Sequence, residues 1–174
     1  MSFVVVAARV LLGVVFAVSA VQKCRDGRDF RRFVTAVAGR DLPVRAALAG
    51  TVAAEFATAA LLLAPAGPGW RVPAGFVLSL GLLIVLTGVL LVAMRQAVQE
   101  PCGCFGTGSG PAGPAHVARN AVLAAAAVAG LAGAHAAPTG DLLVAATLGA
   151  AAAVVVIRLD DLKSLFFTHL RGYG

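Results

Sequence analysis

The chain has 174 residues, of which 60% are apolar and 13% are charged, and its mean hydropathy is +0.92. A soluble domain is typically about 45–50% apolar and about 25% charged, so this composition excludes a soluble globular protein. The formal charge of +6 comes without interleaved aromatic residues, so we expect the basic loops to meet anionic lipid and not nucleic acid.

Five apolar stretches have lengths suited to crossing a bilayer, and they cover residues 3–21, 46–64, 73–94, 115–136 and 142–157. A spanning helix needs about 20 residues, so the last stretch is the weakest, and a helix lying on the membrane surface is its alternative. No basic segment precedes the first stretch, which favours a retained helix over a cleaved signal peptide. We predict an all-α, polytopic membrane bundle that forms a single domain over residues 1–174, with four core transmembrane helices and a fifth.

The connection over residues 22–45 holds seven Lys and Arg residues. Phe30, Phe33, Val34 and Val37 recur among these charges at helical spacing, a pattern that is typical of an interfacial amphipathic helix. We therefore expect a short helix at the membrane surface between the first two spans.

The Cys loop, residues 95–114, is too rich in Gly and Pro to be helical. Successive spans alternate in direction, so this loop and the connection over residues 22–45 share one membrane face. All three cysteines, Cys24, Cys102 and Cys104, are therefore expected on that face.

Cys102 and Cys104 flank a glycine, and such a pair can close a small disulfide ring that is strained and easily reduced. Thiol–disulfide redox chemistry, a metal-binding pair and two structural thiols are the alternatives. A metal would need two more soft ligands, and only Cys24 and His116 are nearby, so we expect no metal.

Cys24 and His116 are candidates for supporting roles on the same face. Cationic neighbours favour a thiolate, so Cys24 can resolve a mixed disulfide, although a free Cys is often only a small apolar residue. His116 can act as a base for the Cys pair or can be an interfacial polar residue.

Charged side chains within the spans mark a second candidate site. By helix rise, Glu55 lies ~13 Å and Arg9 ~20 Å below the cysteine face, and Arg119 lies about a turn deep beside Asn120. We expect Glu55 to pair with Arg9 or Arg119, and these four residues to form a polar pocket beneath the Cys loop. The pocket would seat a quinone ring or the thiols of a partner; a purely structural ion pair is the alternative.

Residues spread from the first to the fourth span resemble the MauE branch of the DoxX-like membrane proteins. They are Arg9, Phe16, Ser19, Lys23, Asp26, Phe30, Glu55, the Pro-Cys-Gly-Cys-Phe-Gly segment at 101–106, and Arg119-Asn120. The resemblance implies a part in disulfide metabolism, because the family's namesake is needed to mature the disulfide-rich methylamine dehydrogenase alongside a thioredoxin-like protein. It also implies a more distant likeness to bundles that pass electrons from thiols to a quinone.

We therefore expect a protein of the cell membrane whose Cys102/Cys104 pair exchanges electrons with a thioredoxin-like or other thiol protein. A non-catalytic membrane anchor or assembly subunit and a small-solute carrier are the alternatives. The charge rule places the cysteine face in the cytoplasm, whereas the resemblance places it outside, where disulfides form.

Overall fold

The computed structural model describes residues 3–39, 43–64, 69–100, 113–133 and 142–171, with side chains as far as residue 158. These segments form helices and contain no β-strand. The helices are α1 (Phe3–Arg25), α2 (Arg28–Ala38), α3 (Val44–Leu63), α4 (Arg71–Arg95), α5 (Pro114–Gly133) and α6 (Leu142–Arg171). The predicted all-α fold class is confirmed.

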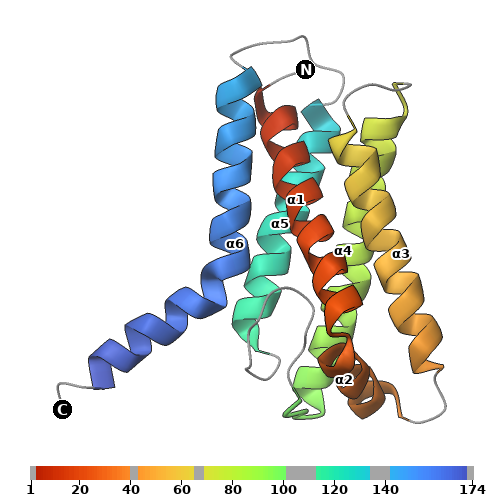
Figure 1. Cartoon of the computed structure of the whole chain (residues 1–174), viewed down its shortest axis with the longest axis vertical. Coiled ribbons are helices and arrows are strands. Elements are labelled where there is room, and N and C mark those ends of the chain that lie inside the picture. The colour runs from red at the N-terminus through yellow and green to blue at the C-terminus, as the bar shows by residue number, and fades with distance from the viewer. Residues whose placement is uncertain (1–2, 40–42, 65–68, 101–112, 134–141, 172–174) are drawn as a thin grey trace.

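Helix α1 is the centre of the bundle. It packs against α3, α5 and α6, while α4 packs against both α3 and α5 (Figure 1). The long helices alternate in direction, and the short α2 contacts α3 and α4 at one end of the bundle. This end, called the α2 end below, also contains the last turn of α1, the start of α3, the end of α4 and the start of α5 (Figure 1).

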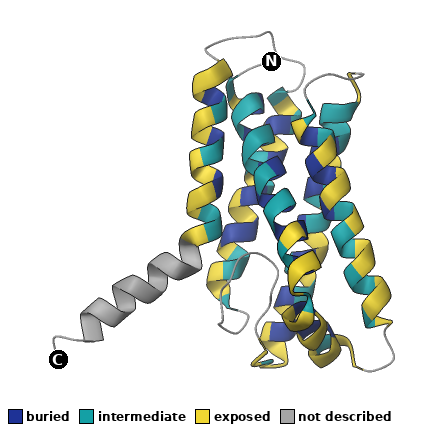
Figure 2. Ribbon diagram, in the orientation of Figure 1, coloured by how far each residue is buried: buried dark blue, intermediate teal, exposed yellow. Residues whose placement is uncertain are grey.

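Apolar side chains fill the core and also cover the outside of the bundle. Phe16, Phe76 and Leu83 are buried at helix contacts, whereas Ile84 and Leu143 are 62% and 78% exposed. Exposed positions recur along the outer faces of the helices (Figure 2). A soluble bundle would carry polar residues there, so these faces are suited to lipid.

Four helices, α1, α3, α4 and α5, are long and apolar enough to cross a membrane. The chain is therefore a multi-pass membrane protein. The apolar part of α6, Leu142–Arg158, is shorter than these four and lies beside α1 (Figure 1). That α6 forms a fifth span stays a prediction.

The expected amphipathic helix is present as α2, but its apolar face packs against protein. Phe30, Phe33 and Val34 are buried, and α2 contacts α3 and α4. The spacing of apolar residues fixes which face is buried, but it does not distinguish a lipid surface from the end of a helix bundle. Helix α2 therefore closes the α2 end of the protein, and its charged face points away from the core.

The contact between α4 and α5 requires a glycine at position 130. A Cβ added to Gly130 would collide with the ring of Phe76, which is fully buried. The ring of Phe76 would have to shift within the core to admit a larger residue, so the two helices pack closely at this point.

We predict that Gly130→Ala destabilises the protein by about 1–3 kcal/mol, because the added methyl group overpacks a filled core. Gly88→Ala is the matched control, since a Cβ there meets nothing within 4 Å and Ala favours helix over Gly. Thermal unfolding of the two purified variants in detergent, followed by circular dichroism, makes the comparison. Equal melting temperatures would contradict the α4–α5 packing.

Candidate functional site

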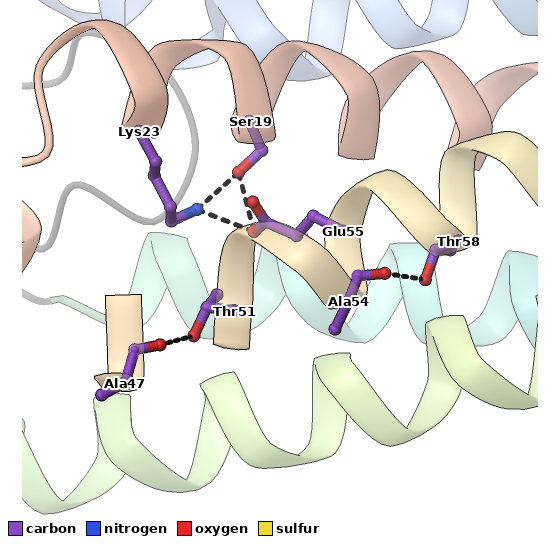
Figure 3. Close-up of polar contacts among 7 residues, drawn as sticks. All are labelled: Ser19, Lys23, Ala47, Thr51, Ala54, Glu55 and Thr58. Atoms are coloured by element: carbon purple, nitrogen blue, oxygen red, sulfur yellow. Dashed lines mark hydrogen bonds and ion pairs between the residues drawn. The ribbon is translucent and has the colours of Figure 1, made fainter. Parts of the chain in front are cut away.

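Lys23 and Glu55 form an ion pair inside the bundle, near the α2 end. Lys23 Nζ lies 2.7 Å from Glu55 Oε1, and the two side chains are 2% and 0% exposed. The same ammonium donates to Ser19 Oγ at 2.7 Å, and the Ser19 hydroxyl donates to Glu55 Oε1 at 3.0 Å (Figure 3). The three groups form a closed hydrogen-bonded triangle that joins α1 to α3.

Local sequence explains why these groups meet. Ser19 and Lys23 are four residues apart and therefore share one face of α1. On α3, the hydroxyls of Thr51 and Thr58 donate to carbonyls one turn earlier in their own helix, at 2.8 Å (Figure 3). Glu55 is thus the α3 side chain that directs its polar group toward α1.

Helix α2 covers the ammonium with an aromatic ring. Lys23 Nζ lies 5.5 Å from the centroid of Phe30, which is buried. A cation–π contact is worth about 2 kcal/mol when it is desolvated. The apolar face of α2 therefore both packs on the bundle and helps to hold the buried charge.

Arg119 and Asn120 extend this polar cluster onto α5. Both side chains are buried, and Arg119 lies close enough to Lys23 for the two positive charges to repel each other. Asn120 Nδ2 donates to Thr87 Oγ1 of α4 at 3.1 Å. The polar cluster, comprising Ser19, Lys23, Glu55, Arg119 and Asn120, thus draws on α1, α3 and α5 and is linked to α4.

Two oxygen atoms of the polar cluster are buried acceptors. Glu55 Oε2 and Asn120 Oδ1 receive no hydrogen bond from any of the described residues. Leaving such an atom unsatisfied costs about 1–3 kcal/mol. Both atoms are suited to accept a hydroxyl or N–H group from water or from a ligand.

Arg9 does not pair with Glu55, contrary to expectation. Its guanidinium donates to the carbonyl oxygens of Leu62, at 2.8 and 3.0 Å, and of Ala64, at 3.3 Å. These carbonyls end α3 without partners in their own helix, and the negative end of the helix dipole also attracts a cation. Leu62 follows Glu55 by ~10 Å of helix rise, so Arg9 belongs to the opposite end of the bundle.

Residues on both sides of the Cys loop are described and lie at the α2 end (Figure 1). Helix α4 ends in a Schellman motif, in which Ala97 N bonds Met94 O at 3.2 Å and Val98 N bonds Ala93 O at 3.0 Å. Ala97 has a φ of 51°, which costs a non-glycine residue about 1–2 kcal/mol. The turn redirects the chain that enters the loop.

The three cysteines and His116 are predicted to lie at the same end of the protein, and the structure describes two of them. Cys24 is exposed in the last turn of α1, at the α2 end. His116 lies in the first turn of α5, where its Nδ1 accepts the backbone N–H of Gly113 at 3.4 Å. Cys102 and Cys104 lie outside the described residues.

Sequence reasoning identified Glu55, Arg119 and Asn120 as buried polar groups but missed the contribution of Lys23. It treated Lys23 as a neighbour that would activate Cys24, whereas its ammonium points inward to Glu55. The four-residue spacing from Ser19 was the available signal, because it places a second polar group on the same helix face.

A family model described as "Methylamine utilisation protein MauE" matches residues 1–133, the segment that contains α1 to α5. The chain belongs to the MauE family. No curated protein and no solved structure matches it. The polar cluster lies entirely within the part that matches the MauE model.

We predict that Glu55→Ala destabilises the protein by about 3–5 kcal/mol, because it leaves the Lys23 ammonium buried without its carboxylate. Glu55→Gln should cost less, since the amide oxygen still accepts a hydrogen bond. The double variant Lys23→Met/Glu55→Met should recover most of the loss, because it removes both charges. Thermal unfolding in detergent measures all three, and an unchanged melting temperature for Glu55→Ala would refute the pair.

Proposed function

We propose that this MauE-family protein is a membrane thiol–disulfide oxidoreductase, in which Cys102 and Cys104 exchange electrons with a soluble thioredoxin-like protein. The observation that supports the proposal best is the position of the polar cluster. It lies just inside the α2 end, where Cys24 is exposed and where the chain enters and leaves the Cys loop. A buried charge cluster next to the exposed Cys24 and the entrance of the Cys loop is a suitable place to bind reacting groups.

The proposed reaction is a two-electron exchange. A thiolate of the reduced partner attacks one sulfur of the Cys102–Cys104 disulfide, which breaks as a mixed disulfide forms. The second partner thiolate then releases this intermediate, so that the partner gains a disulfide and the Cys pair becomes a dithiol. Cys24, which is exposed at the α2 end, provides a third thiol that can resolve a mixed disulfide that stalls.

The reduced Cys pair must pass its two electrons to an acceptor before it can react again. The family resemblance favours a membrane quinone, which takes up two electrons and two protons. The polar cluster suits such a ring chemically. The positive charges of Lys23 and Arg119 favour a carbonyl oxygen that gains negative charge on reduction, whereas Glu55 Oε2 and Asn120 Oδ1 can accept from the hydroxyl groups of a quinol. His116 keeps Nδ1 as an acceptor toward Gly113 and is a less direct candidate for proton transfer.

We predict that Cys102 and Cys104 form a reversible disulfide, because the intervening glycine permits ring closure. Mass spectrometry of alkylated protein should show two additional labels on their peptide after reduction, while labelling of Cys24 stays the same. Cys102→Ser is the control, since it should leave Cys104 labelled in both states. Two freely alkylated thiols after treatment with oxidised glutathione would refute the redox function and favour an assembly subunit.

The distribution of cations supports a cytoplasmic position for the α2 end. Arg25, Arg31, Arg45 and Arg95 are exposed there. At the opposite end, Arg9 and Arg71 donate to carbonyls of α3, at distances of 2.8 to 3.3 Å. Positive charges near spans favour the cytoplasm, so we propose this orientation for the chain.

We predict that a variant retaining Cys24 alone is labelled by a membrane-impermeant maleimide in inverted vesicles but not in intact cells. Trp70→Cys in a cysteine-free background is the control, because Trp70 is 64% exposed at the opposite end. It should be labelled in intact cells. The reverse result would place the cysteines outside, in the compartment where protein disulfides persist.

A further inference from the structure

The charged face of α2 lines a groove at the α2 end. Arg28 and Thr35 are each three or four residues from both Arg31 and Arg32, so the four residues lie on one side of α2. With Ala36 and Glu100 they surround a groove of about 440 Å³. Glu100 is the last described residue before the cysteines and precedes Cys102 by two positions.

The groove presents two arginines that are available to a ligand. Arg28 is held by Asp26 through two bonds, Nε–Oδ1 at 2.9 Å and Nη2–Oδ2 at 3.0 Å. Hydrogen bonds from Arg28 lower the pKa of Asp26 to about 2, so this pair stays charged at physiological pH. Arg31 and Arg32 are exposed, and neither forms an ion pair within the described part of the chain.

The chemistry of the groove fits a peptide better than a lipid phosphate. Guanidinium groups bind carboxylates through two parallel hydrogen bonds. Glu100 adds a carboxylate, which repels a further anion but can accept a backbone N–H. An acidic peptide segment offers both kinds of group. In addition, α2 packs its apolar face on the protein, so lipid is not required to seat the helix.

We propose that this groove binds an acidic segment of the soluble thiol partner and so brings that partner to the Cys pair. The proposal rests on the function proposed above, because it identifies the surface by which the partner of that reaction is recognised. Two extended residues span at most about 7 Å, so a segment bound beside Glu100 is close to the start of the cysteine motif. Charge complementarity of this kind mainly speeds encounter and selects partners.

The test is a binding measurement that needs no thiol chemistry. The full-length protein, in nanodiscs of zwitterionic lipid, is titrated into a fluorescent peptide with four glutamates or into its four-glutamine counterpart. We expect the glutamate peptide to bind roughly tenfold more tightly at low salt, and the difference to disappear at about 0.5 M salt, where charges are screened. Arg31→Gln/Arg32→Gln should weaken binding of the glutamate peptide by about the same factor.

Arg45→Gln/Arg95→Gln is the matched control, because it removes two exposed arginines from the same end but outside the groove. It should change binding less than twofold. Equal losses in both double variants, no preference for the acidic peptide, or a loss of binding to anionic vesicles alone would overturn the proposal. The Cys102→Ser/Cys104→Ser variant should bind normally, so failure of the redox function and failure of docking give different results.

Discussion

Burying Lys23 and Glu55 removes both charges from water, and their mutual attraction must offset a penalty of several kcal/mol for each ion. That condition requires the last turns of α1 to lie against the middle of α3. It also requires an apolar cover over the ammonium, which Phe30 of α2 provides at 5.5 Å. The positions of α1, α2 and α3 at the α2 end therefore depend on one ion pair. Because α2 carries the arginines of the groove, this ion pair also determines where the groove lies.

The four helices α1, α3, α4 and α5 could be predicted because each contains a run of about 20 apolar residues. The prediction for α6 ended at residue 157, whereas the helix continues to Arg171. The position at which α1 ends could not be predicted in this way. The prediction stopped at residue 21, before Lys23, because a hydropathy pattern treats a charge as the end of a span. In the structure α1 continues to Arg25, since the charge of Lys23 is paired inside the bundle.

The partner of Glu55 was missed for a related reason. The sequence indicated only the depth of each residue below the cysteine face, calculated from helix rise along its own helix. This depth placed Glu55 between Arg9 and Arg119. It did not show which helices are neighbours or which of their faces are in contact. Lys23 begins near the α2 end and reaches inward along its flexible stem, as long cationic side chains do. Arg9 is instead bound to the carbonyl oxygens that end α3. Backbone carbonyl oxygens carry no formal charge, so a comparison of charged side chains does not identify them as partners of Arg9.

Helix α6 has a different role from the other long helices, because the polar cluster forms without it. Ser19, Glu55 and Arg119 all lie within the part that matches the MauE model, whereas α6 lies beyond residue 133. Its contact with α1 is close: a Cβ at Gly149 would collide with the backbone of Ala7. Small residues permit such approach between membrane helices. Since α1 carries both Ser19 and Lys23, α6 supports the polar cluster indirectly, by packing against the helix that supplies the buried cation.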